Sequence, residues 1–155
     1  MDGVKNIIVS GLGGQGVLKL TDILSDVLFR AGYDVKKSEV HGMSQRGGSV
    51  SSEVRYGKEV ASPMVPAGEC DVLAVLECDQ IELYLEKLRK GGVLITPDDV
   101  PVKELNNPKS LNVLVLGAIS KHLDIPEKFW TDAIGRAFPE KLREGNLAMF
   151  FLGRK

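Results

Sequence analysis

A cluster of glycines near the amino terminus has the spacing of an anion-binding loop. Gly11, Gly13 and Gly16 satisfy the motif G-x-G-x-x-G, and Gly14 and Gln15 complete the loop. Glycine adopts positive φ angles and lets a ligand approach the backbone closely. Where such a loop opens a helix, free N–H groups and the positive end of the helix dipole favour a phosphate or another anion. The alternative is a tight turn between a strand and a helix that binds nothing.

A nicotinamide dinucleotide is one candidate ligand, but its site has a further requirement. An acidic residue about twenty residues further on, at the end of the second strand, contacts the ribose of the cofactor. The best candidate is Glu39, and Lys36 and Lys37 stand just before it. A stand-alone Rossmann-type NAD(P)-dependent oxidoreductase is therefore an alternative that the sequence leaves open.

A second polar loop, over residues 39–48, carries further groups able to bind a ligand. Loops of this kind often carry function. Arg46 offers a planar fork of N–H donors suited to a carboxylate or phosphate, and His41 can donate or accept a proton near neutral pH. The alternative is a solvated glycine-rich loop. The candidate binding residues here are His41, Gly42, Ser44, Gln45, Arg46, Gly47 and Gly48.

The sequence lacks the residue patterns of a complete catalytic site. It contains neither a G-x-S-x-G nucleophile motif nor a G-x-x-x-x-G-K-[ST] phosphate loop. Cys70 and Cys78 form no C-x-x-C pair and are expected to be ordinary buried thiols. His41 has no second and third ligand at useful spacing. We therefore predict no catalytic residue, no metal and no iron–sulfur cluster in this chain, and favour a subunit or a binding module.

The composition is typical of one folded domain, which we expect to span residues 1–155. Hydrophobic residues make up 43% of the chain and the formal net charge is −1. This charge balance argues against a nucleic-acid binder. No apolar run approaches the ~20 residues of a membrane-spanning helix, and the first residues do not resemble a secretory signal. We expect a cytoplasmic protein that binds neither nucleic acid nor a membrane.

Five segments have the composition or periodicity of strands. Strict alternation at 49–56 predicts a half-exposed strand, and antiparallel pairing would suit it. The other strands are expected from β-branched or continuous apolar runs. Together the expected strands cover residues 4–10, 33–38, 49–56, 72–76 and 93–96.

Helices are expected between and after these strands. They run from the glycine loop to about Ala31, over residues 81–90, around Phe129–Ala137, and from Pro139 to about Phe151. The run Val113–Leu116 would also suit a strand. The order predicts an α/β fold: a single three-layer Rossmann-like domain with a mainly parallel sheet, at least one antiparallel strand and a helical carboxyl terminus. Both loops should lie at the carboxyl edge of that sheet.

Several segments, taken in order, resemble one known family. The most specific are SGLGGQGV at residues 10–17 and SEVHGMSQRGG at 38–48, and Ser62-Pro63, Asn112 and Pro139–Lys141 also fit. Over most of its length the chain is similar to the γ subunit or domain of pyruvate, 2-oxoglutarate and indolepyruvate ferredoxin (or flavodoxin) oxidoreductases. The resemblance implies a helix at 112–121. It also implies that a strand–helix unit is missing, because only residues 97–111 bridge the neighbouring elements.

The resemblance implies a non-thiamine-binding subunit of a complex that oxidatively decarboxylates a 2-oxoacid to an acyl-CoA. Thiamine diphosphate would be held by α- and β-type chains, and iron–sulfur clusters of a ferredoxin-like subunit would pass electrons to ferredoxin or flavodoxin. A homodimer is the alternative assembly of the isolated chain. The γ domain is associated with coenzyme A, so we expect Gly13–Gly16 and Arg46 to hold its phosphates. A non-enzymatic module that binds a nucleotide or a partner remains the other alternative.

Overall fold

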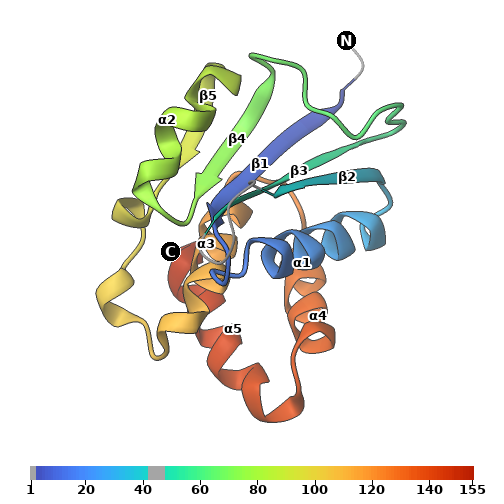
Figure 1. Ribbon diagram of the computed structural model, residues 1–155. Coiled ribbons are helices and arrows are strands. Elements are labelled where there is room, and N and C mark those ends of the chain that lie inside the picture. Colours follow the sequence, from blue (N-terminus) through green and yellow to red (C-terminus); the bar gives the residue numbers. More distant parts are fainter. Residues whose placement is uncertain (1–2, 42–47) are drawn as a thin grey trace.

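One five-stranded sheet organises the molecule. The computed structural model describes residues 3–41 and 48–155, and its strand order is β2-β3-β1-β4-β5 (Figure 1). Strand β1 is parallel to β4, and β4 to β5, whereas β3 is antiparallel to both β1 and β2. One strand of the five therefore opposes the others, which confirms the mainly parallel sheet. The strands are β1 (Lys5–Leu12), β2 (Asp34–His41), β3 (Ser49–Gly57), β4 (Cys70–Val75) and β5 (Leu88–Ile95).

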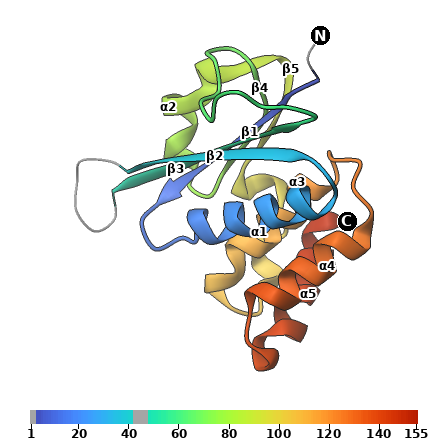
Figure 2. The same cartoon turned by 90° about the vertical axis from the view of Figure 1, so that its right-hand side faces the viewer.

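Helices cover the two faces of the sheet unequally. Four of them lie beneath one face, and the short α2 with the segment 58–69 lies over the other (Figure 2). The main core fills the first side, and a smaller cluster that includes Ile8, Leu73 and Val75 fills the second. These three layers confirm the predicted fold class. The helices are α1 (Val17–Arg30), α2 (Ile81–Tyr84), α3 (Leu111–Ser120), α4 (Glu127–Ala137) and α5 (Glu140–Arg154).

The ambiguous apolar run at Val113–Leu116 belongs to helix α3. Every residue from Asn112 to Ser120 is buried, because α3 lies between the sheet and α5 (Figure 1). A helix that is buried on all sides is hydrophobic all round and loses the periodicity that marks a surface helix. The helix implied by the family resemblance is therefore confirmed.

Strand β3 is not half-exposed as its alternation predicts. Its residues Ser51–Val54 are all buried, since α1 covers one face and the segment 58–69 covers the other. Glu53 accepts a hydrogen bond from the Val65 backbone N–H (2.7 Å), and Arg55 donates to the carbonyls of Ser62 and Met64. The polar face of β3 is therefore bonded to protein instead of water.

The helix expected over residues 81–90 is much shorter. Helix α2 is followed by a 3₁₀ helix at Leu85–Lys87, and β5 already begins at Leu88. Cys70 pairs with Leu88 and Val72 with Val93, so the chain between them bulges. Gly91, with φ of 80°, lies in this bulge and does not end a helix. Pairing with β4 has overridden the local helical pattern.

The connection after β5 contains three 3₁₀ helices, at Pro97–Asp99, Val102–Glu104 and Pro108–Ser110. No further strand follows β5 among the described residues, so β5 is an edge strand of the sheet.

None of the helices described for residues 3–41 and 48–155 has the length and apolarity required to cross a bilayer.

Candidate functional site

The two loops singled out in the sequence meet at the carboxyl edge of the parallel strands. The N–H of Gly13 donates a hydrogen bond to the carbonyl of Gly48 (2.8 Å). Just inside the sheet, Gly11 is paired with Val50 and Leu12 with Ser49. The antiparallel pairing of β1 with β3 thus brings the end of one loop against the start of the other.

Gln15 folds the glycine loop onto itself and ties it to the end of β4. Its side-chain Oε1 accepts a hydrogen bond from the Leu12 N–H (2.7 Å), and its Nε2 donates to Glu77 Oε1 (2.8 Å). Gly11 leaves room for this arrangement, since a Cβ there would lie 2.8 Å from Gln15 Oε1. The Gln15 side chain, which was predicted to bind a ligand, is therefore hydrogen-bonded within the loop and to Glu77.

The amino end of α1 is left uncapped at this edge. Its N-cap is Gly16, with φ of 85°, and neither a side-chain cap nor an acidic residue in the first turn is present. The Gly16 carbonyl accepts from Asn112 Nδ2 (3.3 Å), and a Cβ at Gly16 would lie 2.5 Å from that atom. The first N–H groups of α1 therefore keep the positive potential that attracts an anion.

A cavity of about 410 Å³ opens at this helix end, between β1, α1 and β3. Gly13, Gly14 and Gly16 line it together with Lys19 and Val50. Gly14 has φ of 90°, and the position where its Cβ would stand is open space. The Lys19 ammonium is already engaged, since it donates to the Ala137 carbonyl (2.6 Å). The cavity, called the cradle below, thus combines glycine backbone with apolar side chains such as Val17 and Val50.

Gln80, a buried glutamine that was not predicted from the sequence, links the strands that lead to and from the two loops. Gln80 is only 4% exposed. Its Oε1 accepts hydrogen bonds from the hydroxyls of Ser10 (3.0 Å) and Ser49 (2.6 Å). Gln80 and Glu77 directly follow β4, and their position after a predicted buried strand was the signal that could have identified them.

Comparison with known proteins decides the family. The model of the pyruvate ferredoxin/flavodoxin oxidoreductase family matches residues 6–155. The chain belongs to this family. The similarity indicated by the two motifs is thus confirmed.

Three relatives show how far the likeness extends. Indolepyruvate oxidoreductase subunit IorB of Thermococcus kodakarensis is 46% identical over 91 residues, which cover 59% of this chain and 45% of that protein. The chain spans about half the length of this relative and of the IorB subunits of Pyrococcus horikoshii and Methanothermobacter thermautotrophicus. The γ subunit of a keto/oxoacid ferredoxin oxidoreductase from Geobacter sulfurreducens has the same fold, with a TM-score of 0.80, 22% identity and coverage of 96% and 95%. A 2-oxoglutarate:ferredoxin oxidoreductase from Magnetococcus marinus, solved with coenzyme A bound, gives a TM-score of 0.84, 22% identity and coverage of 99% of this chain and 31% of that one.

This member of the oxidoreductase family does not have the strand order of a dinucleotide-binding Rossmann fold. Strand β3 is inserted between β1 and β2, whereas a Rossmann fold pairs its first two strands directly. The acidic candidate Glu39 lies within β2 and forms an ion pair with Lys37 (2.7 Å). Glu39 is therefore removed from the glycine loop, and the nicotinamide alternative is not supported.

The two cysteines of this family member lie in different environments. Cys70 is buried, and burial raises its thiol pKa to about 12, which keeps the thiol protonated. Cys78 is exposed, so the expectation of two buried thiols is wrong for it. Within residues 3–41 and 48–155, no group of three or more His, Cys, Asp or Glu side chains could hold a metal ion.

The second loop is described only at its two ends. His41 is the last residue of β2, paired with Val50 of β3, so residues 39–41 extend the strand that was expected to end at Ser38. Gly48 contacts the glycine loop as stated above. Gly42, Ser44, Gln45, Arg46 and Gly47 lie outside the described residues, and their role remains a prediction.

Proposed function

We propose that this chain is the γ-type subunit of a 2-oxoacid:ferredoxin or flavodoxin oxidoreductase complex that converts a 2-oxoacid to an acyl-CoA. Membership of the pyruvate ferredoxin/flavodoxin oxidoreductase family carries the proposal. The named relatives support it, because they include an indolepyruvate oxidoreductase subunit and a keto/oxoacid ferredoxin oxidoreductase γ subunit. The subunit assembles in the cytoplasm with thiamine-binding chains and a ferredoxin-like chain.

The cavity at the amino end of α1 is the proposed contact with coenzyme A. The groups that would hold its phosphates are the first N–H groups of α1 and the N–H of Gly14, which match the needs of an anion. The Gly13 N–H is already bonded to the Gly48 carbonyl. Coenzyme A supplies the thiol that accepts the acyl group. The Magnetococcus enzyme, which carries coenzyme A, supports this assignment. Arg46 is the expected side-chain donor to the same phosphates.

Other chains of the complex supply the remaining chemistry in this proposal. Iron–sulfur clusters belong to those chains, because such clusters need sets of cysteine thiolates and the thiols of this chain are a single buried cysteine and a single exposed one. Thiamine diphosphate is assigned to the other chains as well. The γ-type chain positions coenzyme A and excludes water from it. It supplies no group that reacts with the 2-oxoacid.

The cradle can be tested with two matched glycine variants of the assembled complex. Gly14→Ala and Gly32→Ala each place a methyl group on a backbone with positive φ (90° and 103°), and open space surrounds both positions. The backbone strain of the two variants is thus similar, at ~1 kcal/mol. Only Gly14 lines the cavity, so Gly14→Ala should weaken coenzyme A binding several-fold. Gly32→Ala should leave binding unchanged. Calorimetric titration of each complex with coenzyme A measures both values.

Two results would count against the proposal in different ways. Equal coenzyme A affinity of the Gly14→Ala and unaltered complexes would show that the cavity at the amino end of α1 is not part of the coenzyme A site. If a tagged chain is purified from its own cells and no thiamine-binding or iron–sulfur partner comes with it, the proposed complex itself is contradicted.

A further inference from the structure

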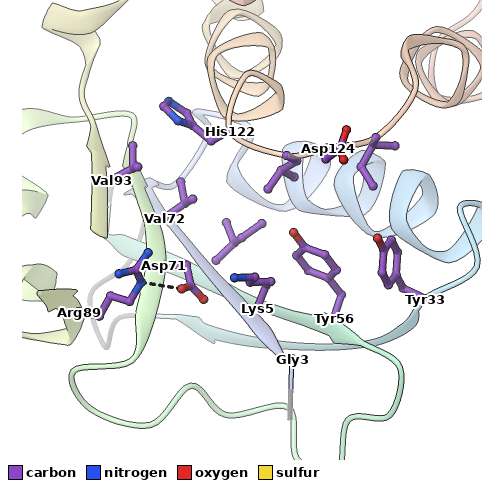
Figure 3. A pocket seen from close by; sticks show the side chains of 13 residues that line it. Gly3, Lys5, Tyr33, Tyr56, Asp71, Val72, Arg89, Val93, His122 and Asp124 are labelled. Carbon is purple, nitrogen blue, oxygen red and sulfur yellow. Dashed lines mark hydrogen bonds and ion pairs between the residues drawn. The ribbon is translucent and has the colours of Figure 1, made fainter. Parts of the chain in front are cut away.

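A second cavity lies at the opposite, amino edge of the sheet and has no part in the proposed function. Its volume is about 400 Å³ (Figure 3). Strands β1, β3, β4 and β5 supply one wall, and residues 122–125, between α3 and α4, supply the other. Strand β1 runs from this cavity to the glycine loop, and its seven residue steps from Lys5 to Leu12 place the two sites ~23 Å apart.

The charges on the strand wall leave a net positive surface. Asp71 is fully occupied: its Oδ1 pairs with Arg89 Nε (2.7 Å), and its Oδ2 accepts from the Asn6 N–H (2.8 Å). Lys5 lies between Asp71 and Tyr56 in Figure 3, and no ion pair joins it to any residue in the described ranges. Arg89 Nη2 likewise has no partner there. Lys5 is therefore free to meet an anion, and the ion-paired Arg89 can add a hydrogen bond through Nη2.

A buried hydroxyl faces the same cavity. Tyr56 is 7% exposed, lines the cavity and makes no hydrogen bond through its hydroxyl within the described part of the chain. Burial, followed by the nearby Tyr33 and Asp71, raises the pKa of Tyr56 well above its ordinary value, so the hydroxyl stays protonated and able to donate. The Tyr33 ring packs edge-on against Tyr56, with centroids 5.1 Å apart, and both hydroxyls point the same way in Figure 3.

The remaining lining is apolar on the sheet side and weakly acidic on the other. Ile7, Val72 and Val93 form an apolar floor. His122 and the exposed Asp124 stand on the facing wall in Figure 3, across the cavity from Lys5. A ligand carboxylate is therefore favoured beside Lys5 and Arg89, on the wall opposite the Asp124 carboxylate. An apolar ligand body would cover the floor.

We propose that this amino-edge cavity is a second binding site, for a small organic monocarboxylate with an apolar body. Lys5 and Arg89 Nη2 hold the carboxylate, Tyr56 donates a hydrogen bond to it, and the floor takes the apolar part. Lys5 and Arg89 Nη2 select for a negative charge, and the apolar floor selects against a bare inorganic anion. The site lies far from the coenzyme A cradle and does not depend on it.

The site can be tested on the full chain by following backbone amide resonances during titration with three probes. Benzoate carries both the charge and the apolar body, benzamide has the same shape without the charge, and inorganic phosphate has the charge alone. Benzoate should bind saturably and shift resonances around Lys5, Tyr56 and Val93. Benzamide and phosphate should each bind at least about 5-fold more weakly, because benzamide loses the charge-assisted hydrogen bonds and phosphate loses the apolar contact.

Variants separate recognition from folding. Lys5→Gln should weaken benzoate about 5- to 10-fold, whereas Lys109→Gln, at an exposed position outside the cavity, should leave the affinity unchanged. Tyr56→Phe should weaken benzoate while the melting temperature stays the same, because the hydroxyl bonds to none of the described residues. Benzamide or phosphate binding as tightly as benzoate, or shifts confined to residues 11–16, would overturn the proposal. The comparison of the three probes uses the unaltered chain, so it does not depend on whether a variant folds.

Discussion

Two glutamine side chains join segments that are far apart in sequence. Gln15 connects the turn after β1 with Glu77 after β4, and Gln80 connects Ser10 of β1 with Ser49 of β3. Both side chains lie beneath or within the two loops that were predicted from the motifs. A glutamine amide suits this task because its oxygen accepts two hydrogen bonds while its nitrogen donates. These residues position the backbone groups that would face an anion.

Removal of the Gln80 amide should destabilise the chain, because the buried Ser10 hydroxyl then has no hydrogen-bond acceptor. In Gln80→Leu the Ser10 hydroxyl, which is 0% exposed, loses its acceptor, at a cost of about 1–3 kcal/mol in the free energy of unfolding. Adding Ser10→Ala should recover part of this loss, because no unsatisfied hydroxyl remains at that position. Urea unfolding of the two single variants and the double variant measures the coupling. If the changes in unfolding free energy of the two single variants simply add in the double variant, the hydrogen bond between Ser10 and Gln80 contributes nothing specific.

At the scale of elements, the close contact of α3 with α5 depends on two glycines that face each other across the helix pair. A Cβ on Gly117 would overlap the Phe150 carbonyl oxygen, and a Cβ on Gly153 would overlap the Leu114 carbonyl oxygen. The backbones of the two helices therefore approach closely. This contact places α3 under the sheet with Asn112 at Gly16, so it also supports the amino end of α1.

Alanine substitutions at two helical glycines should have opposite effects. Gly117→Ala forces α3 and α5 apart and should lower the free energy of unfolding by 2 kcal/mol or more, as ~1–3 kcal/mol is usual for overpacking and backbone atoms cannot yield. Gly135→Ala on α4 meets no atom within 4 Å. It should stabilise by ~0.5–1 kcal/mol, because alanine is the better helix former. Thermal denaturation of both variants gives the comparison. A Gly117→Ala variant as stable as Gly135→Ala would contradict this view of the helix contact.

The whole molecule presents a different chemistry at each end of its sheet. The carboxyl edge carries uncapped helix N–H groups and glycine backbone, and the amino edge carries Lys5, Arg89 and the Tyr56 hydroxyl. This arrangement fits the proposed division of labour, in which other subunits perform the oxidation.

The isolated chain should therefore be inactive. With a 2-oxoacid, coenzyme A and a viologen acceptor, we expect no reduction above background, because no group of this chain is proposed to bind thiamine diphosphate or an iron–sulfur cluster. The complex reconstituted with its thiamine-binding and ferredoxin-like subunits should reduce the viologen under the same conditions. Absorbance of the reduced viologen measures both. Turnover by the purified chain alone would refute the proposed role.

Local sequence alone determined the glycine loop, the helix that follows it and the order of strands and helices. The G-x-G-x-x-G spacing and the apolar stripe of α1 are local properties, and they survive in the structure at Gly16 and Val17–Arg30. The two long motifs were also enough to indicate the family. Binding candidates within 42–47 remain predictions from the sequence.

Tertiary structure decided the burial of β3, the early start of β5 and the network beneath the loops. Ser51 and Glu53 alternate like a solvent-facing strand, and only the segment 58–69, packed over them, makes that face an interior one. Leu88 joins a strand because β4 is available to pair with it. Gln80 acquires its role because the sheet brings Ser10 and Ser49, 39 residues apart in sequence, to one amide oxygen. Contacts between segments distant in the chain are not encoded by local periodicity, so the fold had to supply them.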